Sequence, residues 1–308
     1  MTIYSIGPER ATLHGSFSRE FPPIITIASG DAVHFRTLDA GWHLGPSTEE
    51  LQNRFEPRDL VHDSGHALCG PIAIHGAQPG MTLEIQIHEV RPGNWGWTSA
   101  GGRESAMNRY LGLVESHELL HWTLDADAMT GTDQYGHTIA LRPFMGVMGM
   151  PPDESGIHST IPPRFCGGNI DCKELVAGST LYLPISVPGA LFSVGDGHGV
   201  QGDGEVSGVA IECPMERVDL TFHVREDMPL KTPRARTTNA WVTLGFHENL
   251  HEASFIALEA MLDLMREQYD IPRSQALALA SLVVDLRITQ IANGVHGVHA
   301  VLLDGSIK

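Results

Sequence analysis

Polar side chains that can take part in chemistry are concentrated between residues 169 and 212. They occur as pairs two residues apart, and the pairs are Asn169 with Asp171, Asp196 with His198, and Asp203 with Glu205. Side chains at positions i and i+2 of a β-strand share one face of a sheet. Glycines between the pairs let neighbouring backbones approach closely, so the pairs can converge. A cluster of carboxylates, one imidazole and one amide suits a divalent metal ion with acid and base groups beside it.

A simpler interpretation exists for part of this segment. Asp196-Gly197 and Asp203-Gly204 are ordinary turn dipeptides, and either aspartate taken alone is explained by a turn. The segment Gly195–Glu205, however, places four ionisable groups among five glycines. Such a density of charge is costly to bury and is not needed at a plain turn. The group as a whole therefore favours a functional site.

The elements that would position these side chains are mostly strands. Gly30, Gly80 and Gly178 are each followed, three and five residues later, by apolar side chains, which predicts the start of a strand after each glycine. The run 218–224 alternates apolar and polar residues in the same way. Many short strands joined by glycine turns predict a β-sandwich with a jelly-roll-like core.

Two helices are predicted after residue 233. Apolar residues recur at helical spacing from Glu248 to Tyr269, with acidic residues on the other faces, as in an amphipathic helix. Pro272 and Ser274 are placed to begin a second helix over SQALALASLVVDL, which is apolar on nearly every side and is expected to be buried. We expect this C-terminal helical pair to pack on the sheet. The predicted fold is α+β, mainly β, in a single unit 1–308 that is sheet-rich over 1–232 and helix-rich over 233–308.

Two stretches without periodicity are predicted to be long loops. They are Trp95–Asn108 and Met150–Gly168, which are rich in glycine, proline and polar residues. Long loops in compact domains are often functional. We favour a function for the second loop, because it leads the chain into the segment 169–212.

Composition restricts the partners and the compartment. The chain has 308 residues with 20 Lys and Arg against 37 Asp and Glu, a formal charge of −17, which disfavours binding to nucleic acid or to anionic membranes. A neutral or cationic partner is expected. The sequence shows no signal peptide and no apolar run of membrane-spanning length, so we expect a cytoplasmic protein. Its four cysteines are scattered and are expected to be reduced thiols.

The chain carries a series of motifs in a fixed order. They are CGPIAIHGAQPGMTLEI at 69–85, LRPFMGVMGMPP at 141–152, GGNID at 167–171, GSTLYLPI at 178–185, GALF at 189–192, GDGHGVQGDGE at 195–205, and Glu212. In this order they resemble the acetamidase/formamidase family across residues 25–300. The resemblance implies cleavage of the C–N bond of short aliphatic amides to a carboxylate and ammonia, on a sheet-rich sandwich fold with added helices.

The sequence departs from the family pattern at two positions. Cys166 stands where many members carry His, and Met81 stands where many carry Asp. If the family histidine is a metal ligand, Cys166 would replace it as a thiolate and favour zinc. If it is not, Cys166 is a small buried residue, which is the interpretation we favour; Cys69, Cys172 and Cys213 are expected to be structural.

Roles can be assigned within the predicted site. Asp171 and His198, with Asp196, are expected to hold a divalent cation for metal-assisted hydrolysis, and zinc is the expected metal. Glu205 is the expected general base and proton donor to the leaving amine, with Asp203 as the second choice. Asn169 and the amides of Gly167 and Gly168 are the candidate oxyanion donors.

Other residues receive weaker assignments. His62, His66 and His75 flank the strand that contains CGPIAI and are candidates to line the pocket, although each alone is more simply structural. Asp285 and Arg287 lie in the predicted second helix, where an ion pair or a helix end explains them.

Two alternative functions remain open at the level of the sequence. One is an amidase that uses Cys166 or Cys69 as a nucleophile. The other is a non-catalytic sandwich that binds a small molecule, because a fold alone does not fix a function. The expected partners are a small neutral amide and further copies of the chain, since an apolar C-terminal helix and the family resemblance both indicate a homo-oligomer of two or more subunits.

Overall fold

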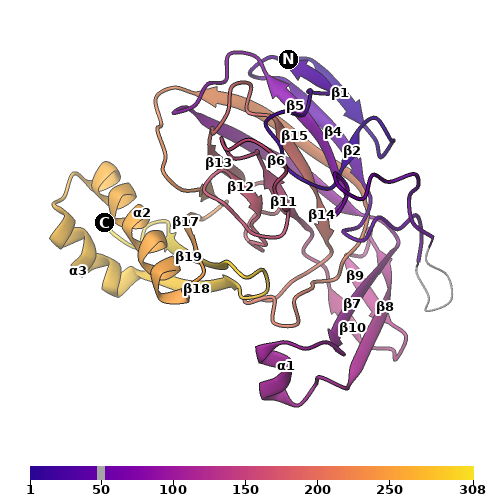
Figure 1. Ribbon diagram of the computed structural model, residues 1–308. Coiled ribbons are helices and arrows are strands. Elements are labelled where there is room, and N and C mark those ends of the chain that lie inside the picture. The colour runs from indigo at the N-terminus through magenta and orange to yellow at the C-terminus, as the bar shows by residue number, and fades with distance from the viewer. Residues whose placement is uncertain (47–52) are drawn as a thin grey trace.

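The computed structural model describes residues 1–46 and 53–308 and consists mainly of β-sheet (Figure 1). A nine-stranded sheet forms the larger layer and runs across the molecule into its C-terminal part. Its strands, in spatial order, are β1 (Ile3–Ile6), β4 (Ala32–Thr37), β15 (Met215–Arg225), β6 (Thr82–Pro92), β13 (Thr180–Pro184), β16 (Arg234–Arg236), β17 (Ala240–His247), β19 (His296–Leu303) and β18 (Val284–Gln290).

A second sheet packs against the first and completes a sandwich. Phe192 of the second sheet meets Phe222 of β15 edge to face, with ring centroids 5.1 Å apart, and one hydrophobic core includes residues of both sheets. The strands of this sheet are β12 (Gly167–Asn169), β11 (Phe144–Gly149), β14 (Phe192–His198), β5 (Leu68–Ile74) and β2 (Leu13–His14) in that order, with β3 (Ile25–Ile27) also paired to β5. The mainly β prediction is confirmed, and the jelly-roll-like topology stays a prediction.

A smaller sheet extends away from the sandwich together with a short helix (Figure 1). This sheet is formed, in order, by β10 (Thr138–Ala140), β9 (Thr130–Asp133), β8 (His117–Asp125) and β7 (Trp95–Gly101), and the helix is α1 (Ala106–Leu111). The prediction of a loop at Trp95–Asn108 was therefore wrong. Its first part is the strand β7, and every residue of β7 pairs with β8. Most of β7 is half-buried on both faces, so its sequence lacks the alternation that marks a strand with one buried face.

The three strands predicted from turn glycines are confirmed. Gly30, Gly80 and Gly178 each lie two residues before β4, β6 and β13, respectively. Their φ angles of 94°, 91° and 88° lie in the left-handed region that favours glycine. The predicted long loop at residues 150–168 is also largely confirmed, because regular structure resumes only with β12 at Gly167.

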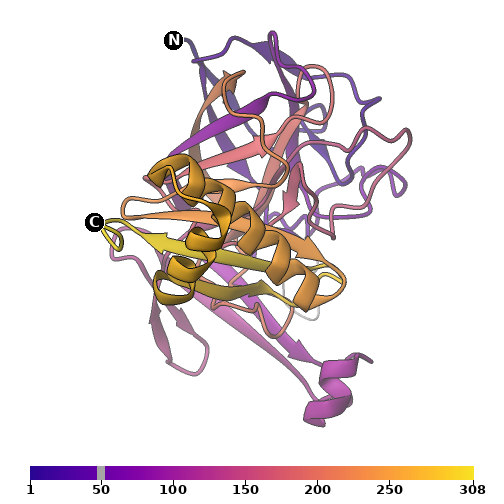
Figure 2. The same cartoon turned by 90° about the vertical axis from the view of Figure 1, so that its left-hand side faces the viewer.

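The amphipathic helix predicted from Glu248 to Tyr269 is α2 (Leu250–Tyr269). Asn249 caps it by accepting hydrogen bonds from the amides of His251 and Glu252. The helix buries the apolar face predicted for it, and Figure 2 shows α2 and its neighbour α3 (Arg273–Val283) lying over the C-terminal strands.

The second predicted helix is shorter and less buried than expected. Residues after α3 form β18, which pairs with β19 at the end of the nine-stranded sheet. The β-branched residues Val283 and Val284 favour this change from helix to strand. Leu282 of α3 is 79% exposed, so the expectation of a fully buried helix was wrong. Asp285 and Arg287 lie on β18 and form an ion pair there. No helix within the described residues has the length and apolar character needed to cross a membrane.

A buried histidine joins β2 to β14. The Nδ1 atom of His14 donates to the carbonyl of Ser16 at 2.6 Å, and its Nε2 atom accepts from Ser193 Oγ at 2.9 Å. Burial lowers the pKa of His14 from 6.5 to about 4. The folded protein therefore binds fewer protons at this position than the unfolded chain between these two pH values, and the free energy of unfolding falls as pH falls through that range.

We predict that His14 contributes strongly to acid sensitivity. Between pH 6.5 and pH 4, protonation of His14 in the unfolded chain should lower the free energy of unfolding of the wild-type protein by on the order of 3 kcal/mol. The His14→Gln protein should not show this decrease. Urea unfolding of both proteins across this range measures the difference, in which the other titrating groups largely cancel. His75→Gln, at an exposed histidine, is the matched control. Parallel pH profiles for wild-type and His14→Gln protein would contradict the prediction.

Candidate active site

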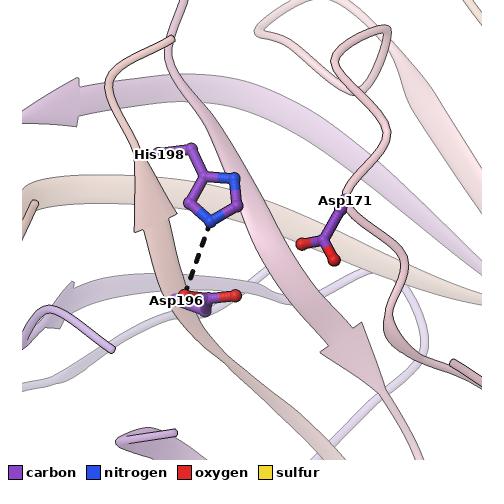
Figure 3. A group of neighbouring side chains, drawn as sticks. All are labelled: Asp171, Asp196 and His198. Atoms are coloured by element: carbon purple, nitrogen blue, oxygen red, sulfur yellow. Dashed lines mark ion pairs between the residues drawn. The ribbon is translucent and has the colours of Figure 1, made fainter. Parts of the chain in front are cut away.

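Three of the predicted residues meet beside the second sheet. Asp196 and His198 lie two apart on β14, and Asp171 follows β12, with β11 between these two strands. Figure 3 shows the carboxylate of Asp171 facing Asp196 and His198. One possible ligand atom from each of the three lies within 4.8 Å of the others, so the predicted convergence of Asp171, Asp196 and His198 is found.

A glycine on β11 makes this meeting possible. A Cβ atom at Gly146 would lie 2.5 Å from Asp196 Oδ2 and 2.8 Å from both Asp171 Oδ1 and His198 Cε1. Any side chain at this position would push the three groups apart. Gly146 therefore leaves the space in which the cluster forms.

Two glutamates complete what we call the acidic cluster, defined as Asp171, Asp196, His198, Glu205 and Glu212. His198 Nε2 lies 3.5 Å from Asp196 Oδ1 and 3.4 Å from Glu212 Oε2. His198, Glu205 and Glu212 form a second group whose ligand atoms all lie within 4.8 Å of one another. All five residues of the cluster are buried.

The two glutamates are positioned by neighbouring sheets. The backbone of Glu212 exchanges two hydrogen bonds with that of Trp97 on β7, each 2.9 Å long. Gly204, which precedes Glu205, donates to the carbonyl of Thr289 and accepts from the amide of Ile291. The end of β18 thus fixes Glu205, and β7 fixes Glu212.

The backbone is strained at three of the five cluster positions. Asp171, Asp196 and Glu205 have φ angles of 50°, 58° and 44°, in the left-handed region that residues with a side chain rarely adopt. Such residues collect at functional sites, where the surrounding structure maintains the strain. The strain indicates that geometry at this site is maintained at the expense of stability.

Several polar atoms of the cluster and of the neighbouring Asn169 have no hydrogen-bond partner within the described part of the chain. They are Asp171 Oδ1, His198 Nδ1, Glu205 Oε2, Glu212 Oε2 and Asn169 Oδ1. Buried polar groups are normally hydrogen-bonded, and leaving them unpaired is costly. Carboxylate oxygens and an imidazole nitrogen are ligands for zinc and related divalent ions, so these residues fit a cation.

Burial shapes the protonation of the cluster. Burial, aided by the charge of Asp171, raises the pKa of Glu205 to about 10, and burial raises the pKa of Asp171 to about 8. For His198 the effect of burial is outweighed by the carboxylates of Glu212 and Asp196, which raise its pKa well above the usual range. For Asp196 burial is likewise outweighed, and the charges of His66 and His198 lower its pKa.

Three residues of the cluster, Asp196, Glu205 and Glu212, line a small cavity of about 190 Å³, whereas Asp171 and His198 do not. The polar lining also includes Asn169, Asn293 and His66. The other lining residues are Ala40, Gly41, Trp97, Gly208 and Val209. Among the described residues that line it, none is lysine or arginine.

A larger cavity elsewhere is a weaker candidate. It has a volume of about 500 Å³ and includes Arg10 and His62 in its lining. Its charges are already paired, since Arg10 binds Asp63 and His62 binds Asp59, each at 2.6 Å. Of the three histidines proposed to line the catalytic pocket, only His66 does so.

Other predicted residues are placed differently from expectation. Asp203 binds Lys173 Nζ at 2.8 Å and is not among the residues that line the small cavity. The amide of Gly167 donates to the carbonyl of Arg164, so it is not free to bind an oxyanion. Gly168 pairs with Met148 of β11, and neither glycine lines the cavity, whereas Asn169 does.

The cysteines do not take part in the cluster. Cys166 is buried, its Sγ donates to the carbonyl of Met150, and burial raises its pKa to about 11. Burial raises the pKa of Cys69 to about 12. The thiolate is the reactive form of cysteine, so these thiols are poorly suited to serve as a nucleophile. Neither of the two groups of possible metal ligands found among the described residues includes a cysteine.

Sequence reasoning missed two polar residues of the site. Glu212 ends the last recognised motif, and the density of charge around it was the available signal. Asn293, in the turn between β18 and β19, donates from Nδ2 to Asp171 Oδ2 at 2.6 Å. No local motif marks Asn293, because the contact spans 122 residues.

Comparison with known proteins identifies the family of the chain. The family model described as "Acetamidase/Formamidase family" matches residues 5–158 and 153–302. The chain belongs to the acetamidase/formamidase family. Among members of the acetamidase/formamidase family, the formamidase of Methylophilus methylotrophus is 26% identical over 63% of this chain, and the acetamidase of Mycolicibacterium smegmatis is 27% identical over 63%. The matches span 60% and 61% of those relatives, respectively.

Solved structures of the family share the fold. The acetamidase of Bacillus halodurans superimposes with a TM-score of 0.83 at 25% identity, covering 97% of this chain and 97% of that one. The likeness therefore includes the sandwich, the small extended sheet and the C-terminal layer.

We predict that His198 and Glu205 have separable roles. In the metal-assisted mechanism predicted from the sequence, His198→Ala should lose both the bound cation and amide hydrolysis, because it removes the imidazole that both groups of possible ligands share. Glu205→Gln should retain metal and lower kcat by about 10²- to 10⁴-fold, the usual contribution of a proton-transfer group. Elemental analysis and ammonia release measure the two properties.

Cys166→Ser is the control for this pair of variants. The buried thiol lies outside the cluster, so most activity and all metal should remain. Full activity in His198→Ala, or a dead Cys166→Ser protein with full metal content, would contradict the assignment.

Proposed function

We propose that this chain hydrolyses small neutral aliphatic amides such as formamide and acetamide. Water adds to the amide carbonyl, the C–N bond breaks, and the products are a carboxylate and ammonia. The observation that carries the proposal is the buried acidic cluster with unpaired ligand atoms, which opens into a small cavity in a chain of the acetamidase/formamidase family. No observation favours a non-catalytic binding role.

Asp171, Asp196 and His198 are the residues that would hold a divalent cation. Zinc is the proposed metal, since carboxylate and imidazole groups form its catalytic sites. When bound, the cation would polarise the amide carbonyl and acidify water. The contact from Asn293 orients the carboxylate of Asp171.

Glu205 is the proposed proton-transfer group. It lines the cavity, and burial together with the neighbouring carboxylates raises its pKa, which makes its ionised form a stronger base. In the proposal the ionised carboxylate of Glu205 accepts a proton from the attacking water, and the carboxylic acid so formed donates that proton to the leaving nitrogen. Asp203 is not retained for this role because Lys173 neutralises it away from the cavity. Asn169 remains the proposed group beside the carbonyl oxygen.

The lining of the cavity supports neutral substrates. Among the described residues that line the cavity, none is lysine or arginine, so no side chain with a permanent positive charge is there to bind an anionic substrate. Its volume of about 190 Å³ is below the range of about 300–1,000 Å³ that is usual for sites of drug-sized ligands. Short amides without charge fit both constraints.

The test of the proposed function is ammonia release by the purified protein. Formamide and acetamide should yield ammonia and the corresponding carboxylate, and chelation should abolish turnover until Zn²⁺ is restored. Succinamate, which carries a carboxylate, should have a lower kcat/KM than acetamide. Absence of turnover in zinc-loaded protein would contradict the function, and a preference for succinamate would contradict the neutral-substrate assignment.

We also propose that the chain forms a dimer through β18, the last strand of the nine-stranded sheet. Leu286 and Ile288 pair with Ala300 and Val298 of β19, whose side chains belong to the core beneath the helices. Leu286 and Ile288 share that face but are 48% and 43% exposed. An uncovered apolar strip on a sheet edge is a template for pairing with another strand.

The charges on β18 suit pairing with a second copy. If two β18 strands pair antiparallel about Leu286, Asp285 of each strand lies opposite Arg287 of the other. Val284 then lies opposite Ile288, and the apolar strip is continuous across the two-fold axis. Centring the pair on Arg287 would instead place like charges together.

Light scattering tests this interface. The wild-type protein should scatter as a particle of twice the 33.4 kDa chain mass at micromolar concentration. Leu286→Lys should shift the equilibrium toward the monomer, because a dimer of this variant would bury two lysine charges at the two-fold axis. Phe255→Ser is the control, since Phe255 is similarly exposed on α2 but lies away from the edge. A monomeric wild-type protein would rule the interface out.

A further inference from the structure

A second, larger cavity lies beside the catalytic one. It has a volume of about 420 Å³ and a mainly apolar lining that includes Trp122, Ile139, Val200 and Ile211. Two residues, Glu205 and Val209, line both cavities. These two side chains therefore form the boundary between the catalytic space and the apolar space.

Val209 lies on a segment without regular structure, residues 206–210, which we call the strap. The strap is held near its ends, where Gly208 donates to the carbonyl of Glu205 and the carbonyl of Ala210 accepts from Thr98 Oγ1 at 2.6 Å. The amide of Ala210 also donates to Glu212 Oε1 at 2.9 Å. The strap thus connects the two glutamates of the acidic cluster and places Val209 between them.

The lining of the catalytic cavity includes apolar groups that suit an acyl chain. Trp97, Ala40 and Val209 line it together with polar side chains of the acidic cluster, and we call these three residues its apolar wall. Trp97 is fixed there, because its Nε1 donates to the buried carboxylate of Asp39 at 2.8 Å. The half-buried Val209 is the apolar residue of this wall that also faces the second cavity.

We propose that Val209 determines substrate specificity by limiting the length of the acyl group, an inference that rests on the proposed amide hydrolysis. The isopropyl group closes the catalytic cavity on the side where larger apolar space begins. One- and two-carbon acyl groups fit within the closed cavity, and longer ones meet Val209. Removing the two γ-methyl groups of Val209 joins the two cavities and gives a longer acyl chain an apolar site.

The expected size of the effect follows from hydrophobic transfer. Each methylene group that gains burial in an apolar site contributes about fourfold to binding. Discrimination by a pocket against one methylene group runs to about 10- to 200-fold. Opening the boundary at Val209 should therefore raise the ratio of kcat/KM for long amides to kcat/KM for short amides by about tenfold or more.

The experiment compares kcat/KM for formamide, acetamide, butanamide and hexanamide in the zinc-loaded full chain. The wild-type protein should prefer the two short amides. Val209→Ala should raise the ratio of hexanamide to acetamide by about tenfold or more. Val209→Leu, which adds volume, should lower the ratio of butanamide to formamide and gives a second test if the alanine variant is poorly folded.

Val206→Ala is the matched control, because Val206 lies on the same strap and lines only the apolar cavity. Its ratio of hexanamide to acetamide should equal that of the wild-type protein. Three results would overturn the role of Val209 while leaving the proposed amide hydrolysis intact. They are an equal rise of the hexanamide-to-acetamide ratio in Val206→Ala, unchanged ratios in both Val209 variants, and a wild-type protein that hydrolyses hexanamide as well as acetamide. Absence of ammonia from every amide with wild-type protein would overturn the proposed function and this inference together.

Discussion

Burial of like charges is the constraint on which the rest of the molecule depends. Four carboxyl groups and one imidazole share a space with little access to water, and an ionised carboxylate costs several kcal/mol to bury even after relaxation. Raised pKa values at Glu205 and Asp171 reduce this repulsion without removing it. Attraction between His198 and the carboxylates of Asp196 and Glu212 offsets only part of this cost, so the surrounding strands must hold the members of the cluster in place.

The chain meets this requirement by drawing the cluster from separate elements. β14 supplies Asp196 and His198, the end of β12 supplies Asp171, and Gly146 on β11 leaves the space between them. The glutamates belong to a segment that is fixed at one point by β7 of the smaller sheet and at another by the end of β18, the last strand of the nine-stranded sheet. The left-handed backbone at three cluster residues shows that the sheets impose this arrangement against local preference.

Sequence alone predicted the part of the site that obeys strand periodicity. Asp196 and His198 are two apart on a real strand, and motif order brought Asp171 to them. Asp203 follows the same spacing, but Asp203 and Glu205 lie on a turn, where alternate residues need not share a face. The contribution of Asn293 depends on how distant strands pair, which local sequence does not encode. The same limit applies to the fold, since β7 is half-buried on both faces and β18 continues an apolar run that began as a helix.

The contacts from β18 and the turn after it place a condition on the order of events during synthesis. Gly204 is held by Thr289 and Ile291, and Asp171 is held by Asn293, so the last strands of the chain close a site whose other residues were made long before. A chain that ended before β18 would lack the backbone partners of Gly204 and the side-chain partner of Asp171. Completion of the site therefore depends on residues made after all the members of the cluster.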